Sequence, residues 1–160
     1  MLLRGAEFYK IGIVVDDLTE AVSRYRELFD YEWGDGATVA QPFPVLIGDE
    51  IRTVTNRAVI TRQKPRIHLI EATPGTPWEV DRGGQVHHLA YWVEELQEAA
   101  RQITAQGYSF ECGDAAEDPA ARTWGYYTHP HGPRLELMRR TTTPEEWDAR
   151  LDSLAPFVVG

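Results

Sequence analysis

The segment "KIGIVVDDLTEA" (residues 10–21) decides the fold, because it recurs in altered form as "HLAYWVEELQEA" (residues 88–99). Each segment contains a strand-like apolar run, two acidic residues, a leucine and a polar stretch that ends in Glu-Ala. An acidic pair is favourable at the positive end of a helix dipole, and the apolar spacing after each pair is helical. Each segment therefore predicts a strand followed by an amphipathic helix, and the chain contains an internal repeat. The apolar positions of the two predicted helices are Leu18, Ala21, Val22, Tyr25 and Leu28, and Leu96, Ala99, Ala100 and Ile103.

A second pair of similar segments ends each half of the chain. These are "RIHLIE" (residues 66–71) and "RLELMR" (residues 134–139), and a proline precedes each one. Residues 36–61 and 107–128 contain enough short β-like runs for two further strands in each half. We therefore expect an α+β fold made of two tandem βαβββ modules, which form a cleft of curved mixed β-sheet.

The expected boundaries follow from the repeat. The first module covers residues 1–78 and the second covers residues 79–140, within one structural domain. Residues 141–160 form a C-terminal extension with a short helix, since Thr143 and Glu146 make a capping-box pattern around Pro144. We expect Trp147 and Leu151 of this helix to pack on the body of the protein.

Composition limits the classes of function. The 160 residues carry a net charge of −9, and the Lys and Arg residues are dispersed, which disfavours a nucleic-acid partner. No apolar stretch approaches the length of a membrane span or the core of a signal peptide, so a cytoplasmic location is expected. The single cysteine, Cys112, excludes an intrachain disulfide and is expected to be an ordinary small side chain, because no nucleophile motif surrounds it.

The repeat selects four polar positions for attention. Equivalent residues of the first strands are Lys10 and His88, and equivalent residues of the last strands are His68 and Glu136. If the four strands line a common cleft, two imidazoles and one carboxylate suit a divalent transition metal that keeps an open position for substrate. The alternative is that both histidines are ordinary strand residues and that Glu136 is a solvated partner of Arg134.

At this point the sequence resembles the vicinal oxygen chelate superfamily, which includes glyoxalases, methylmalonyl-CoA epimerases, extradiol dioxygenases and antibiotic-binding proteins. The resemblance extends from Tyr9 to about Met138 and is strongest for the glyoxalase-like, epimerase-related branch. Four segments carry it: "KIGIVVDDLTEAVSRYRELF" (10–29), "IHLIEATPGTPW" (67–78), "GGQVHHLAYWVEELQEA" (83–99) and "HPHGPRLELM" (129–138).

The resemblance implies that Lys10, His68, His88 and Glu136 occupy the four metal-ligand positions of the family. His68 stands where the family more often has Glu or Gln, and a metal that accepts nitrogen and oxygen tolerates this exchange. Lys10 replaces the usual histidine. Because a protonated lysine has no lone pair to donate, a site with four protein ligands is not expected.

Two outcomes stay open for Lys10. In one, His68, His88 and Glu136 hold a divalent metal (Zn, Co, Ni, Mn or Fe) and Lys10 serves as a catalytic acid or base. In the other, the ammonium group pairs with Glu136 in place of the metal, and the cleft binds its ligand without any cation.

The resemblance implies a metal-dependent isomerase, epimerase or lyase that stabilises an enolate of a small carbonyl or acyl substrate, with Lys10 and Glu136 as catalytic residues. A second interpretation is a metal-free protein that binds, sequesters or transforms an aromatic or polyketide-like molecule, and a third is an Fe(II) dioxygenase. The candidate substrate contacts are Trp92, Trp124, Tyr126 and Arg122. A small-molecule substrate and a homodimer are expected.

By strand alternation, His87 should face away from His88 and have a structural role.

Overall fold

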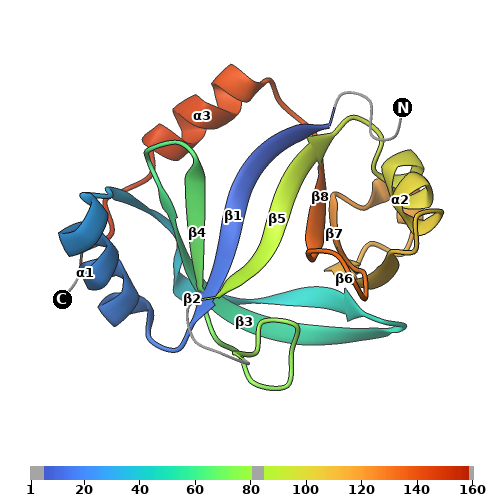
Figure 1. Ribbon diagram of the computed structural model, residues 1–160, viewed down its shortest axis with the longest axis horizontal. Helices are drawn as coiled ribbons and strands as arrows, with labels where there is room; N and C mark the ends of the chain where they lie inside the picture. The colour runs from blue at the N-terminus through green and yellow to red at the C-terminus, as the bar shows by residue number, and fades with distance from the viewer. Residues whose placement is uncertain (1–5, 81–84, 159–160) are drawn as a thin grey trace. The chain divides into compact units, whose positions relative to one another are not determined.

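The computed structural model describes residues 6–80 and 85–158, and the elements follow the predicted order of strand, helix and three strands, twice (Figure 1). The first copy contains β1 (Glu7–Val15), α1 (Leu18–Phe29), β2 (Trp33–Ile47), β3 (Glu50–Thr61) and β4 (Arg66–Glu71). The second copy contains β5 (Val86–Val93), α2 (Leu96–Thr104), β6 (Ser109–Asp114), a short 3₁₀ turn η1 (Pro119–Ala121), β7 (Trp124–Thr128) and β8 (Leu135–Arg139). The chain continues into α3 (Pro144–Asp152). The α+β fold with two βαβββ copies and a C-terminal helix is thus confirmed.

The sheet is mixed, and the two copies use the same pairings. In the first copy β4 lies between β1, to which it is parallel, and β3, to which it is antiparallel. In the second copy β8 lies between β5, to which it is parallel, and β7, to which it is antiparallel. The strand order is β1-β4-β3-β2 in one copy and β6-β7-β8-β5 in the other, and β2 pairs with β6. The first and last strands of each copy are therefore neighbours.

Two compact units are distinguished by their internal contacts, and neither is one continuous segment. The His88 unit consists of Met1–Tyr9, Phe43–Val54 and His88–Thr141, and the Lys10 unit consists of Lys10–Pro42, Thr55–His87 and Thr142–Gly160. Several long strands begin in one unit and end in the other. The module boundaries after residues 78 and 140 stay a prediction.

In the Lys10 unit, α1 covers the face of β1 and β4 that carries odd-numbered residues. Leu18 and Val22 are fully buried against Ile13 and Leu69, as the apolar spacing predicts. Leu28 departs from the prediction, because 65% of it is exposed. The buried stripe of α1 ends one turn earlier.

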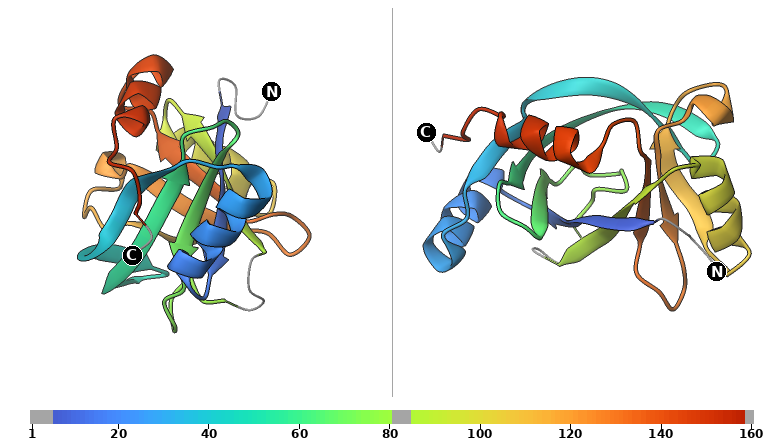
Figure 2. Two further views of the ribbon diagram at one scale, coloured as in Figure 1. Left: turned by 90° about the vertical axis from the view of Figure 1, so that its left-hand side faces the viewer. Right: turned by 90° about the horizontal axis from the view of Figure 1, so that it is seen from above.

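In the His88 unit, α2 covers the corresponding face of β5, β8 and β7 (Figure 2). Leu96, Ala99 and Ile103 are buried with Tyr127 and Leu137. Because strand residues alternate between the two faces, the even-numbered residues of the same strands face away from the helix. These are the positions on which the predicted site depends.

The C-terminal helix α3 is anchored by a buried arginine. Thr143 and Glu146 form the predicted capping box at its start, and Leu151 is buried, as expected. Arg66, which is 3% exposed, donates a hydrogen bond from Nη2 to Asp148 Oδ1 at 3.0 Å. The helix is therefore held to β4 by a charge-assisted hydrogen bond as well as by apolar packing. Within the two described ranges, no helix has the length and apolar character needed to span a membrane.

Candidate functional site

The most enclosed polar pair of the His88 unit is made by His88 and Glu136. Ala90 lies opposite Glu136 in the parallel pairing of β5 with β8, so His88 stands two residues before the position facing Glu136. His88 Nε2 and Glu136 Oε2 are 3.2 Å apart, and the two residues are only 1% and 5% exposed. The repeat therefore selected two residues that the strand register brings into direct contact.

Aromatic residues surround this pair on the same face of the sheet. Tyr126 lies opposite Glu136 across β7 and β8, and its ring centroid is 4.7 Å from that of His88. Trp124 packs edge-on against Tyr126 at 5.6 Å, and Trp92, on the same face of β5, is almost fully buried. Three of the four predicted substrate contacts thus share the face of His88. The fourth, Arg122, lies in the loop before β7 and lines a pocket beside α2.

The equivalent residues of the Lys10 unit occupy equivalent places. Gly12 lies opposite His68 in the parallel pairing of β1 with β4, as Ala90 lies opposite Glu136 in the other copy. Lys10 is 6% exposed and His68 is half-buried. In both copies the first-strand residue stands two positions before a small residue that faces the last-strand residue. Each pair is a feature of its own unit.

The structure corrects the alternative in which Glu136 is a solvated partner of Arg134. Glu136 is buried, and the carboxylate that Arg134 contacts is that of Glu111, with Nε to Oε2 at 2.7 Å and Nη2 to Oε1 at 2.8 Å. Sequence reasoning missed Arg66, which lies opposite Lys10 in the register of β1 and β4. The repeat could have drawn attention to Arg66, since Arg66 and Arg134 occupy equivalent positions in its two copies.

Two other residues have structural roles. His87 Nε2 lies 2.6 Å from the carbonyl oxygen of Pro77. This contact gives the imidazole a partner within the protein and explains its presence by a structural role. Cys112 is fully buried, and burial, together with the negative charge of Glu111, raises the pKa of its thiol. A thiol with a raised pKa is a poor nucleophile, so Cys112 is not a candidate catalytic residue.

The His88 and Glu136 donors are compatible with a shared metal ion. Ligand atoms bound at about 2.0–2.2 Å to one tetrahedral or octahedral cation lie roughly 3.0–3.5 Å from each other, and the observed separation is 3.2 Å. Among residues 6–80 and 85–158, however, no group of three or more His, Cys, Asp or Glu side chains is arranged to hold a metal ion. The pair therefore fits as two ligands of a cation.

Comparison with protein families now adds to this geometry. The family model described as the glyoxalase, bleomycin resistance protein and dioxygenase superfamily matches residues 9–128. The chain belongs to this superfamily. No curated protein sequence matches it significantly.

Solved structures of the superfamily fold are similar over most of the chain. A methylmalonyl-CoA epimerase in complex with methylmalonyl-CoA and NH4+ is 20% identical, with a TM-score of 0.54, and the match covers 89% of this chain and 97% of the epimerase. Methylmalonyl-CoA epimerase from Mycobacterium tuberculosis is also 20% identical, with a TM-score of 0.51 and coverage of 92% and 94%. A hypothetical protein from Bacillus halodurans is 13% identical, with a TM-score of 0.55 and coverage of 88% and 98%. At these identities the structural similarity shows the fold alone.

Proposed function

We propose that this protein is an isomerase or epimerase that stabilises an enolate of a small carbonyl or acyl substrate at His88 and Glu136. The observation that carries the proposal is the buried contact between His88 Nε2 and Glu136 Oε2 at 3.2 Å. An imidazole and a carboxylate held this close together in a buried setting are two donors that can serve one cation or one substrate group. The superfamily membership and the epimerases among the similar structures support this choice.

In this proposal His88 and Glu136 supply two ligands of a divalent metal ion, and the His68→Ala variant described below tests the third ligand that the sequence suggests, His68. Such a cation would stabilise negative charge on a carbonyl oxygen when a proton is removed next to the carbonyl. The two imidazoles and one carboxylate suit Zn, Co, Ni, Mn or Fe. The same donor types would also serve a lyase that passes through an enolate or an Fe(II) dioxygenase.

The remaining residues have roles that follow from their chemistry. Lys10 is the proposed acid or base, because an amine at the first-strand position equivalent to His88 can carry a proton to or from a substrate. Tyr126 packs against His88 and Trp124 packs against Tyr126, and with Trp92 on the same face of β5 they form an apolar wall that is proposed to limit the access of water to the reacting carbon. Exclusion of water prolongs the lifetime of an enolate against quenching by solvent.

A second candidate function is favoured by the burial of Lys10, which is 6% exposed. An ammonium group beside a divalent cation is repelled, whereas an ammonium group that replaces the cation is attracted to the Glu136 carboxylate. The protein would then bind an aromatic or polyketide-like molecule against the apolar wall without a metal, or transform it there.

Metal binding separates the two candidates. We expect the purified protein to bind about one equivalent of Zn(II) or Co(II) in a titration followed by mass spectrometry of the eluted metal. Glu136→Gln and His68→Ala should lower the stoichiometry well below one, and Lys10→His should raise the affinity. The matched control is Glu98→Gln, which removes an exposed carboxylate on α2 and should leave binding unchanged. Absence of metal from the wild type, together with binding by Lys10→His, would show that the metal-dependent proposal is wrong.

Proton exchange tests the chemistry itself. In heavy water, methylmalonyl-CoA and a panel of hemithioacetals should incorporate deuterium next to the carbonyl when the protein is present, as NMR spectroscopy can detect. Glu136→Gln should slow this exchange by about 100-fold or more, because a charged group at the reacting centre is lost. Tight binding of aromatic compounds without exchange of any acyl substrate would instead favour the binding protein.

We also propose that the protein is a homodimer. Multi-angle light scattering should then give twice the chain mass of 18.2 kDa.

A further inference from the structure

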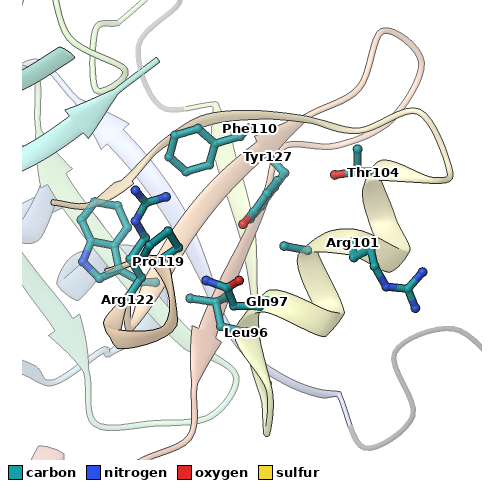
Figure 3. Close-up of a pocket in the computed structure, with 10 residues that line it drawn as sticks. Leu96, Gln97, Arg101, Thr104, Phe110, Pro119, Arg122 and Tyr127 are labelled. Carbon is teal, nitrogen blue, oxygen red and sulfur yellow. The ribbon is translucent and has the colours of Figure 1, made fainter. Parts of the chain in front are cut away.

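The His88 unit contains a pocket beside α2, the helix that covers the face of the sheet opposite to His88 and Glu136. Its cavity volume is about 340 Å³, and it lies between α2, the turn η1 and strand β7. Figure 3 shows Arg122, Phe110 and Tyr127 around the same space as Leu96 and Gln97 of α2. A volume of this size falls within the range of small-molecule sites.

A buried hydroxyl group opens into this pocket. Tyr127 is 6% exposed, and its side chain extends toward the space between Arg122 and α2 (Figure 3). Within residues 6–80 and 85–158, no hydrogen-bond partner of this hydroxyl is found. Burial raises the pKa of Tyr127, while the positive charge of Arg122 opposes the rise, so the hydroxyl is a neutral donor at physiological pH.

The guanidinium group of Arg122 has N–H groups that are available to a ligand. Its Nε donates to the carbonyl oxygen of Ala116 at 3.3 Å, and in the described part of the chain its two terminal nitrogens make no hydrogen bond. The nearby carboxylate of Asp114 is already occupied: Oδ1 accepts from the Ala116 amide, and Oδ2 accepts from the Thr123 amide and hydroxyl. Arg122 therefore keeps the planar pair of N–H groups that suits a carboxylate.

In the first copy of the repeat, a carboxylate of the protein itself accepts hydrogen bonds from a helix start and from an arginine. At the start of α1, the Leu18 amide donates to the Glu71 carboxylate at 3.3 Å, and Arg57 donates to both oxygens of the same carboxylate at 2.9 and 3.1 Å. At the start of α2, the N-cap residue Glu95 makes no side-chain capping hydrogen bond. The residue equivalent to Glu71 is Arg139, which donates to the carbonyl oxygens of Ala120 and Ala121 instead.

We propose that this pocket binds a small aromatic carboxylate, whose anionic group contacts Arg122, the Tyr127 hydroxyl and the start of α2. The ligand supplies from outside the carboxylate that Glu71 supplies within the first copy. Phe110 and the ring of Tyr127 present apolar surface to the body of the ligand, and flat rings pack well against such residues. Trp124 lines this pocket and also packs against Tyr126 beside His88, but the proposal does not depend on the function proposed for His88 and Glu136.

The probe for this site is 2-naphthoate, with uncharged 2-naphthamide as its matched neutral analogue. By isothermal titration calorimetry, we expect 2-naphthoate to bind at least about tenfold more tightly than 2-naphthamide, because only the carboxylate forms a charge-assisted pair with Arg122. Arg122→Gln should weaken 2-naphthoate binding by about tenfold or more. The control is Arg24→Gln, which removes an exposed arginine of α1 with the same change in net charge and should leave binding unchanged.

A second variant places a carboxylate of the protein itself beside Arg122. Gln97 lies in the first turn of α2 and lines the pocket, and Gln97→Glu places a carboxylate next to Arg122 and the helix start. This variant should raise the melting temperature of the unliganded protein and abolish binding of 2-naphthoate. The chemical-shift changes caused by 2-naphthoate should appear at α2 and Tyr127 and persist in Glu136→Gln.

Three results would overturn the proposal: equal affinity of wild type and Arg122→Gln, equal affinity for 2-naphthoate and 2-naphthamide, or shift changes at His88 instead of α2. Absence of any 2-naphthoate binding up to about 10 mM would do the same, since that limit corresponds to less than about 3 kcal/mol of binding free energy.

Discussion

The two copies of the repeat share one fold but differ in how the start of each helix is satisfied. In the first copy, the Asp17 side chain accepts from the Glu20 amide, and Glu71 accepts from the Leu18 amide. In the second copy, Glu95 occupies the N-cap position without a capping hydrogen bond. The backbone can therefore be duplicated while its polar groups acquire different partners, and the copy with fewer internal partners is the one with donors available to a ligand.

The two copies also differ in the polar pair that lies on the sheet face pointing away from each helix. Lys10 and His68 stand at the same register positions as His88 and Glu136, but only the second pair contains a carboxylate. An imidazole and a carboxylate at 3.2 Å can attract a cation, whereas a lysine and an imidazole cannot attract one in their charged forms. The second copy therefore carries most of the proposed chemistry.

The largest expected effect tests whether the two copies contribute equally to stability. Leu69 and Leu137 are equivalent residues, and both are fully buried. Leu69→Ala and Leu137→Ala should each lower the free energy of unfolding by about 3 kcal/mol, because each leaves a cavity in its core. Urea denaturation measures the loss, and Leu28→Ala, at a position that is 65% exposed, is the control. A much smaller loss for one leucine would show that the copies are not equivalent in packing.

The next effect contrasts the two arginines near the helix starts. Arg57→Gln should lower the free energy of unfolding by about 1 kcal/mol, because it breaks a two-point contact with the partly buried Glu71 carboxylate. Arg122→Gln should leave the unliganded protein about as stable as the wild type, since among the described residues Arg122 donates one hydrogen bond, at 3.3 Å to the Ala116 carbonyl oxygen. Thermal unfolding measures both. An equal loss of stability in the two variants would show that Arg122 contributes as much to the folded state as Arg57 does, and the expected contrast would be wrong.

The helix caps should respond in opposite directions. Asp17→Ala removes the cap of α1 and should cost about 1 kcal/mol in the free energy of unfolding. Glu95→Asp shortens the side chain at the N-cap of α2 to one that can cap, and should add about 0.5 kcal/mol. Chemical denaturation of the two variants checks the signs. A loss of stability in Glu95→Asp would mean that the start of α2 is already satisfied.

The smallest effect depends on pH and concerns the anchor of α3. Burial acts to raise the pKa of Asp148, but hydrogen bonds from Lys64 and Arg66 prevail and hold that pKa below its ordinary value. A carboxyl group with a lowered pKa stabilises the folded state above its ordinary pKa, and this contribution is lost as the pH falls through the folded-state pKa.

Asp148→Asn should therefore be slightly less stable than the wild type at pH 7, and the difference should shrink in acid. Melting temperatures recorded across that pH range measure the trend, with exposed Asp49→Asn as the control. A difference that grows in acid would contradict the assigned direction.

Much of the fold could be predicted because its signals are local. Periods of two and 3.6 residues located the strands and helices, and the repeat placed His88 and Glu136 in one set of four polar positions with Lys10 and His68. Leu28 was the exception, because helical spacing does not indicate where the neighbouring sheet ends. The partner of Arg134 was also beyond prediction, since Glu111 reaches it only through the folding of β6 against β7 and β8.

The sequence by itself determined the duplicated βαβββ pattern, the face on which each strand residue lies, and the equivalence of Lys10 with His88 and of His68 with Glu136. Only the tertiary structure decided that Arg122 lies beside α2, and that Glu95 makes no capping hydrogen bond at α2 whereas Glu71 accepts from a backbone amide at α1. The physical reason is that alternation and helical period are properties of neighbouring residues, whereas the partner of a charged side chain depends on segments that are distant in the chain.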